Sequence, residues 1–447
     1  MTTPKRYLFA IIDGGGTVPA DTSVIRALVG RGHDVRVLAD RVLAPDVEST
    51  GAEHIPWTRA PQRPDLDPKS VIINDWDAKT PSEAFARVRD GAMVGPADLF
   101  AADVREELQR RPADAVVANF FVFGAQIAAE AEGLPFAFLV SNILSFPSSN
   151  TPPLGPGLKP ARGRLGRARD ATLNRLMARL FDKGLGRLNE VRRENGLEPM
   201  DSVLQNFERA DRLLLLTSRA FEYEQYSPPP NVRITGPRLD DPAWAGDWTP
   251  PPGDSPLVLV GMSSTFMDHG DVLQRATTAL GELPVRGLVT TGRAIPVESI
   301  DAPPNVTLVE RAPHSEVLRH ASAVVTHAGH GTVIKSLAAG VPVVALPLGR
   351  DQLDNAARVV HHGAGLKLKP KASSDRIAAA VRRVLDEPSF AAGARRIADA
   401  IAVETARDLA VEELEGLAAA RQGSDPTIAG YAPQLAVGGS DPLSLGR

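Results

Sequence analysis

The chain has 447 residues, of which 43% are hydrophobic and 23% charged, with a formal net charge of -4 at pH 7 and no cysteine. This composition is typical of a soluble globular protein and excludes disordered, collagen-like and coiled-coil chains. The lack of cysteine excludes disulfides, zinc–thiolate sites and thiol nucleophiles, and it favours a reducing, cytoplasmic location. The slight negative charge disfavours nucleic acid as a partner, and no apolar run is long enough for a membrane span.

The first half of the chain predicts alternating strands and helices. An apolar run at 7–12 has the length of a strand, a glycine-rich turn follows at 14–16, and helical periodicity extends from about Asp21 to Gly30. Further strand-like runs lie at 33–38, 115–118, 135–140 and 212–216. Continuous apolar strands separated by helices predict a parallel sheet that is covered on both faces.

A change of composition divides the chain in two. Residues 237–256 are rich in Pro, Gly, Asp and Trp, suit neither helix nor strand, and form the predicted linker. The pattern then restarts, with strand-like runs at 257–260, 287–290, 306–309, 323–326 and 342–346. We therefore predict an α/β protein with two Rossmann-like domains, each a doubly wound parallel sheet, that face a cleft. The domains are residues 1–236 and 257–421, and residues 422–447 form a loose tail.

Residues 159–193 are more basic than the rest of the chain, with many Lys and Arg and few acidic residues. One interpretation is a patch that contacts an anionic surface or partner. The other is a solvated helix face and loop, which is what most charge runs are. Both interpretations stay open at this point.

The glycine-rich turn at 14–16 separates the first strand from the first helix. A dinucleotide fingerprint needs a third glycine where this chain has Pro19, although Asp40 ends the second strand as a ribose-binding acid would. NAD binding is therefore disfavoured. A glycine turn at the carboxyl end of a strand still lets a ligand approach the backbone, so we expect this turn to line the cleft.

A second glycine-rich turn is more specific. It reads His-Ala-Gly-His-Gly-Thr at 327–332 and lies between the strand at 323–326 and a helical run. Such a turn directs free backbone N–H groups and the positive end of a helix dipole at one point, which suits a diphosphate. No Gly-Lys-Ser or Gly-Lys-Thr follows, so a Walker motif is excluded. A loop rich in hydroxyl groups at 261–265 follows the first strand of the same domain and is expected at the same edge.

These motifs belong to a longer ordered signature. Residues 309–366 contain Glu-Arg-Ala-Pro-His-Ser-Glu-Val-Leu, then Thr-His-Ala-Gly-His-Gly-Thr, then Leu-Pro-Leu-Gly-Arg-Asp-Gln. This order resembles the donor-binding signature of the inverting GT-B glycosyltransferases of family 1, which include the UDP-glycosyltransferases and bacterial enzymes that glycosylate antibiotics. The similarity covers nearly the whole chain, including Arg-Gly-His at 31–33 and the start of the linker.

The resemblance implies a GT-B fold and a metal-independent hexosyltransferase. Its donor would be a UDP-sugar or dTDP-sugar, used as a co-substrate without any cofactor. Its acceptor would be a lipophilic small molecule of phenol, polyketide or macrolide type, glycosylated with inversion at the anomeric carbon. A monomer or homodimer is expected.

The resemblance also implies a set of donor-binding residues in the second domain. They are Ser263, Ser264, Thr265, Arg311, Ala312, His314, His327, Gly329, His330, Gly331, Thr332, Asp351 and Gln352. The 327–332 turn and the 263–265 loop would enclose the diphosphate from two sides. Asp351 and Gln352 would hydrogen-bond the sugar hydroxyls.

The nucleoside end of the donor site departs from the family pattern in two places. The backbone of Ala312 would contact the base, but Arg311 stands where many members place a stacking Trp. A guanidinium also stacks on a base. Lys335 stands where plant members carry a Glu that binds the ribose, which tilts the choice of nucleotide toward dTDP.

The first domain lacks the usual catalytic dyad. Counting back from 31–33 places Thr17 at the position of the general base His, and Asn119 falls at the position of its Asp partner. Neither side chain accepts a proton usefully near pH 7. A nearby group substitutes, or the acceptor is acidic enough to need little base, or the chain is catalytically silent. The candidate substitutes are Asp13, Asp21 and His269.

Two further functions stay open. One is a non-catalytic partner that binds an NDP-sugar, and the other is an NDP-sugar epimerase, which shares the GT-B architecture but needs carboxylates facing the sugar ring. Asp351 is the one such carboxylate that the sequence offers. Two Asp-x-Asp sequences, at 65–67 and 75–77, resemble a metal motif of another glycosyltransferase fold, but we expect a solvated surface loop there and predict no metal site.

Overall fold

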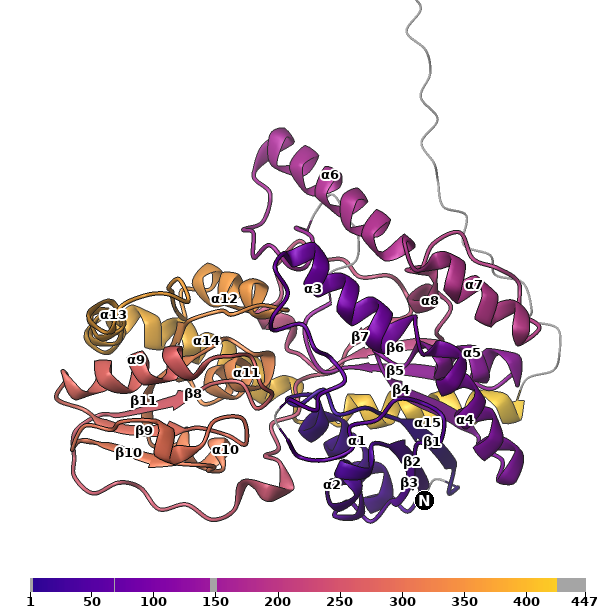
Figure 1. Cartoon of the computed structure of the whole chain (residues 1–447), viewed down its shortest axis with the longest axis horizontal. Helices are drawn as coiled ribbons and strands as arrows, with labels where there is room; N and C mark the ends of the chain where they lie inside the picture. The colour runs from indigo at the N-terminus through magenta and orange to yellow at the C-terminus, as the bar shows by residue number, and fades with distance from the viewer. Residues whose placement is uncertain (1–2, 68, 145–150, 424–447) are drawn as a thin grey trace, which may run out of the picture.

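The computed structural model describes residues 3–67, 69–144 and 151–423 of the chain. It contains two parallel β-sheets with helices packed against them (Figure 1). The first sheet has seven strands in the order β3-β2-β1-β4-β5-β6-β7, and the second has six in the order β10-β9-β8-β11-β12-β13. The prediction of two doubly wound α/β domains is confirmed.

The strands of the first sheet are β1 (Arg6–Ala10), β2 (Asp34–Ala39), β3 (Glu53–Pro56), β4 (Ala115–Asn119), β5 (Phe136–Val140), β6 (Arg212–Leu215) and β7 (Val232–Ile234). The strands of the second are β8 (Leu257–Gly261), β9 (Arg286–Thr290), β10 (Val306–Val309), β11 (Ala321–Thr326), β12 (Val343–Ala345) and β13 (Gly365–Lys367). Three short edge or near-edge strands, β3, β7 and β13, were not predicted, because runs of three or four residues carry little periodicity.

The helices before the linker are α1 (Val18–Gly30), α2 (Ala44–Glu48), α3 (Pro81–Val88), α4 (Ala97–Arg110), α5 (Phe123–Ala131), α6 (Gly163–Asp182), α7 (Leu185–Glu194) and α8 (Gln205–Glu208). Those after it are α9 (Gly270–Gly281), α10 (His314–Val317), α11 (His330–Ala338), α12 (Gln352–His361), α13 (Ser374–Asp386), α14 (Pro388–Glu404) and α15 (Leu409–Gly423). Helix α1 begins earlier than its periodicity suggests, because Pro19 suits the first turn of a helix.

The central strands are buried on both faces, as their continuous apolar sequence predicts. Tyr7, Leu8, Phe9 and Ala10 of β1 have no exposed surface. Side chains of α15 join the core beside β1, and the Tyr7 hydroxyl donates to the Leu414 carbonyl at 3.1 Å. Helix α15 (yellow in Figure 1) thus lies against the first domain, although the range 257–421 places it in the second by sequence order. Most of the predicted tail, 424–447, is outside the described residues.

Each sheet reverses its strand order at one place, between β1 and β4 in the first sheet and between β8 and β11 in the second. Ligands of doubly wound sheets bind beyond the carboxyl ends of the strands at such places. The 14–16 turn follows β1, and Asn119 ends β4. The 262–265 loop follows β8, and His327 follows β11. These four segments therefore lie at the points where doubly wound sheets bind ligands.

Candidate active site between the two domains

The turn between β11 and α11 has the form that a diphosphate site needs. Gly329 is the N-cap of α11 and has no side chain to satisfy the first-turn N–H groups, which point out of the helix. Ala328 has a φ of 69°, a conformation that non-glycine residues rarely adopt, and Asn355 holds it by donating to its carbonyl at 3.0 Å. The turn is thus fixed, and among the described residues the N–H groups of His330, Gly331 and Thr332 have no hydrogen-bond acceptor.

His327 lies directly over this turn. A Cβ added to Gly329 would come within 2.4 Å of His327 Nε2, so glycine at 329 leaves room for the imidazole. Burial, together with the nearby His269 and Arg350, lowers the pKa of His327 to about 3. The imidazole is therefore neutral near pH 7 and contributes a hydrogen bond rather than a charge.

The hydroxyl-rich loop closes the site from the other side. Ser263 Oγ lies 3.1 Å from Thr265 Oγ1 and accepts from the Thr265 N–H at 3.2 Å, and both residues are buried. Ser264 is exposed. A Cβ on Gly15, whose φ is 69°, would come 2.4 Å from Thr265 Cγ2, so the glycine turn of the first domain touches this loop. The turn thus lies at the boundary between the domains, and its place in a ligand cleft stays a prediction.

Asp351 and Gln352 begin α12 close to the same turn. Asp351 Oδ2 accepts from Asn355 Nδ2 at 2.8 Å, and burial raises the pKa of Asp351 above its ordinary value. Gln352 Oε1 accepts from the N–H groups of Leu348 and Gly349, at 2.7 and 3.1 Å. The Gln352 side chain thus braces its own loop in this structure.

The region assigned to the nucleoside combines exposed and buried groups. Arg311 is exposed and Ala312 is buried. His314 Nε2 lies 3.1 Å from Thr290 Oγ1, and burial, followed by the charge of Lys335, lowers the pKa of His314 to about 4. Neutral His314 thus braces the strand end beneath this region.

Lys335 and His330 have partners outside the donor turn. Lys335 Nζ pairs with Asp241 of the predicted linker at 2.7 Å. His330 Nε2 lies 2.9 Å from Thr217 Oγ1, just beyond β6 of the first domain, and burial lowers the pKa of His330 to about 4. The His330 side chain therefore joins the two domains, whereas its backbone N–H belongs to the α11 N-terminus together with those of Gly331 and Thr332.

A buried carboxylate lies beside the two predicted dyad positions. Asp21, in the first turns of α1, accepts from Asn119 Nδ2 at 2.8 Å and from Ser141 Oγ at 2.9 Å. Burial raises the pKa of Asp21 to about 7, although these two hydrogen bonds oppose the shift. The Thr17 hydroxyl is buried and has no hydrogen-bond partner among the described residues. Thr17 and Asn119, which the sequence analysis named as the two dyad positions, thus lie with the candidate base Asp21 at one end of α1.

The other two candidate bases are in different surroundings. Asp13 forms an ion pair with Arg63 at 2.7 Å and also accepts from the Gly15 N–H at 2.9 Å. His269 is fully buried, and within the described chain neither of its ring nitrogens has a hydrogen-bond partner. Burial lowers the pKa of His269 to about 4.

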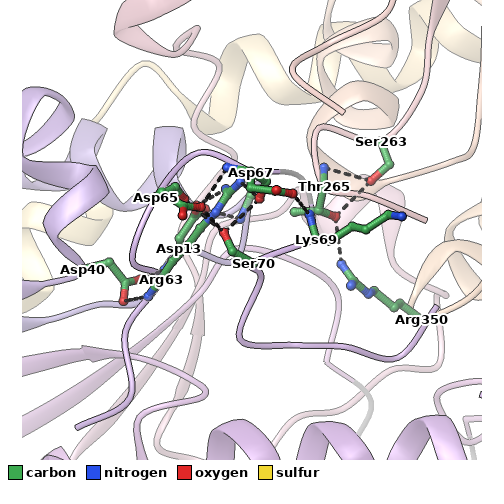
Figure 2. A network of polar contacts seen from close by, with 11 residues as sticks. Asp13, Asp40, Arg63, Asp65, Asp67, Lys69, Ser70, Ser263, Thr265 and Arg350 are labelled. Carbon is green, nitrogen blue, oxygen red and sulfur yellow. Dashed lines mark hydrogen bonds and ion pairs between the residues drawn. The ribbon is translucent and has the colours of Figure 1, made fainter. Parts of the chain in front are cut away.

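The loop containing the Asp-x-Asp sequences corrects one expectation. Asp65 and Asp67 are exposed, but the side chain of Asp75 is only 6% exposed and pairs with Arg350 at 2.7 Å. The next residue, Trp76, packs edge-on against Phe266 with ring centroids 4.9 Å apart. Figure 2 shows Asp65, Asp67, Lys69 and Ser70, from the part of this loop that precedes Asp75, together with Thr265 and Arg350. Asp75 and Trp76 thus lie at the domain boundary, whereas residues 65–67 are exposed as expected.

The basic segment 159–193 forms α6, α7 and the chain around them. Some of its charges are paired within the first domain, including Arg169 with Asp170, Arg187 with Asp98, and Arg192 with Glu130. Among the described residues, no helix is long and apolar enough to cross a bilayer. The same residues contain no group of three or more His, Asp or Glu side chains suited to a metal ion.

Comparison with known proteins agrees with this architecture. Residues 288–417 match the family model "Erythromycin biosynthesis protein CIII-like, C-terminal domain". The 4'-demethylrebeccamycin synthase of Lentzea aerocolonigenes is 34% identical over 435 residues, which span 92% of this chain and 99% of that protein.

Two solved structures share the fold. The calicheamicin glycosyltransferase CalG4 has a TM-score of 0.72 at 22% identity, covering 93% of this chain and 98% of that one. The glycosyltransferase VinC in complex with dTDP has a TM-score of 0.62 at 17% identity, covering 93% and 100%. The two parallel-sheet α/β domains and these structural neighbours define a GT-B fold. The chain belongs to the GT-B glycosyltransferases of family 1.

Proposed function

We propose that this glycosyltransferase moves a sugar from UDP or dTDP to a lipophilic natural product, with inversion at the anomeric carbon and without a metal ion. The observation that carries the proposal is the free N-terminus of α11, covered by His327 and faced by the Ser263–Thr265 hydroxyls. The relative that makes a rebeccamycin compound and the dTDP complex of VinC support the acceptor class and the nucleotide.

The donor turn supplies what the departing diphosphate needs. When the bond from the anomeric carbon to the diphosphate oxygen breaks, the diphosphate gains one negative charge. The first-turn N–H groups of α11 and the neutral His327 imidazole are fixed donors, and such donors stabilise developing charge without reorganising. These groups perform the role that a metal ion performs in other transferases.

On the acceptor side, we propose Asp21 as the proton acceptor, acting through Ser141. A carboxylate with a pKa of about 7 is matched to proton transfer at neutral pH, whereas the Asp13 carboxylate is occupied by Arg63. Asp21 is fully buried, so the acceptor hydroxyl or N–H gives its proton to Ser141 Oγ, which passes its own to Asp21 at 2.9 Å. The freed acceptor atom bonds to the anomeric carbon as the diphosphate leaves. The unpartnered Thr17 hydroxyl is available to orient the acceptor.

The test is to incubate the full-length protein with UDP-glucose or a dTDP-sugar, with and without phenolic, macrocyclic and indole acceptors. We expect nucleotide release together with an acceptor-dependent mass gain of one sugar, unchanged by EDTA, and an inverted anomeric centre by NMR. His327→Ala should lower turnover strongly; unchanged turnover would refute our placement of the diphosphate. Nucleotide binding without turnover on any acceptor would instead support the non-catalytic partner, and release without acceptor would support the epimerase.

A further inference from the structure

Arg350 lies between the predicted donor site and the first domain. It immediately precedes Asp351 and has a φ of 54°, a left-handed conformation that costs free energy in a non-glycine residue. Its Nη1 donates to Thr265 Oγ1 at 3.2 Å, on the loop that closes the diphosphate site. Strained backbone at a residue that reaches into a ligand site indicates a side chain whose placement matters.

The opposite edge of the guanidinium is held by the first domain. Arg350 Nε and Nη2 donate to the two oxygens of Asp75, at 2.9 and 2.7 Å, and the Asp75 side chain is 6% exposed. A guanidinium has five N–H donors, so this fork uses one edge and leaves donors on the other. Asp75 therefore fixes the plane of the Arg350 guanidinium. Arg350 still has N–H groups that can bind an anion.

The loop that carries Asp75 is anchored at both ends. Arg63 pairs with Asp13 at 2.7 Å and donates to the Asp67 carbonyl at 2.8 Å, beside the end of β1 (Figure 2). At the far end, Trp76 packs against Phe266. Asp75 is thus a rigidly placed group, supported by its own domain on one side and by the donor loop on the other.

The diphosphate of a nucleotide is an anion, and the groups described so far offset only part of its negative charge. Burial keeps His327 and His269 neutral near pH 7, and a helix N-terminus supplies only about half a positive charge. A nucleoside diphosphate carries more negative charge than these groups offset. The Arg350 guanidinium is close enough to depress the pKa of His327, so its positive charge is felt at this site although Asp75 pairs with its other edge.

We propose that Arg350 binds the diphosphate of the nucleotide and stabilises it as the leaving group, and that Asp75 of the other domain positions the Arg350 guanidinium for this role. This inference rests on the proposed nucleotide-sugar site. It adds a residue to the donor site and makes that site dependent on a carboxylate of the first domain.

The test is calorimetric titration of the full-length protein with UDP and with dTDP at low salt. Arg350→Gln should weaken binding of the preferred nucleotide at least tenfold, and Arg350→Lys should retain part of the affinity, because it keeps the charge but loses the fork. Arg164→Gln, on the exposed side of α6, makes the same change in net charge and should leave binding unchanged. Thermal unfolding of each variant checks that it is folded, and Arg350→Lys carries the test if Arg350→Gln is not.

Asp75→Asn tests the positioning role. It should weaken nucleotide binding about threefold in the native background and have no effect in the Arg350→Gln background, because Asp75 acts through Arg350. Tighter binding by Asp75→Asn would show that the carboxylate only repels the ligand, and an equal loss in both backgrounds would show a merely structural role.

If the native protein binds nucleotide and Arg350→Gln binds it equally well, the role of Arg350 is refuted while the proposed function stands. If the native protein binds neither UDP nor dTDP, the proposed function itself fails.

Discussion

At the scale of single residues, the first domain places the buried carboxylate of Asp21 beside Thr17 and Asn119, the two positions that the family resemblance implies for the catalytic dyad. The amide of Asn119 donates to Asp21, which stands four residues after Thr17. An amide that donates to a carboxylate favours its charged form, and burial opposes this. The balance gives a pKa of about 7, which makes Asp21 a group that titrates within the working range of an enzyme.

The pH–rate profile tests this assignment. A base must be deprotonated, so kcat/KM should rise with pH and level off above about pH 7. Asp21→Asn should lower kcat by about 10² to 10⁴ and abolish that rise. Ser141→Ala removes a hydrogen bond that lowers the pKa of Asp21, so any residual activity should require higher pH. A native profile that is flat between pH 5.5 and 8.5 would contradict the role of Asp21.

At the scale of elements, the junction of β11 and α11 is the part of the site that sequence predicts best. The turn is continuous in sequence, so a glycine, a histidine and a helix start at fixed spacing define its geometry. Asp75 and Arg350 could not be predicted in this way, since 275 residues separate them and neither lies in a motif that names the other. Asp21 could be predicted only in part, because the sequence placed it near Thr17 but gave no indication of its hydrogen bond to Asn119.

Gly329→Ala tests the geometry of this junction. The added Cβ would come 2.4 Å from His327 Nε2, so the imidazole must move away from the helix N-terminus. We expect at least a tenfold rise in the dissociation constant for UDP or dTDP, with little change in thermal stability. Gly186→Ala, in α7 of the first domain, is a matched control, since its Cβ would meet no atom within 4 Å. Equal affinities for the two variants would show that His327 does not lie over the diphosphate.

At the scale of the whole molecule, buried polar contacts between side chains fix the position of one domain relative to the other. The hydrophobic periodicity of the sequence does not predict these contacts. Arg358 of α12 pairs with Glu222 of the first domain at 2.7 Å, with both side chains almost fully buried. His330 and Thr217 form a second buried contact across the boundary. The sequence predicted two domains facing a cleft, because the alternation of strands and helices and the composition of the linker are local patterns. It could not predict which side chains meet across that boundary, because such contacts depend on the relative placement of the two sheets.

The His330 contact makes the stability of the whole molecule sensitive to acid. Its pKa is about 4 in the folded protein, below the ordinary value of 6.5 for His, so the unfolded chain binds a proton between these pH values that the folded chain does not. The stability that neutral His330 contributes is therefore complete above pH 6.5 and lost as the pH falls toward 4. His330→Gln keeps a neutral hydrogen-bonding group opposite Thr217 and removes the titration.

We expect His330→Gln to reduce the dependence of the free energy of unfolding on pH between 4 and 6.5. The slope should fall by up to about 1.4 kcal/mol per pH unit, the value for one proton. Urea unfolding of the native protein and the variant at several pH values measures this difference directly. His320→Gln, at an exposed position of the same domain, is the matched control and should follow the native curve. If His330→Gln also follows the native curve, His330 is not kept neutral by burial at the domain boundary.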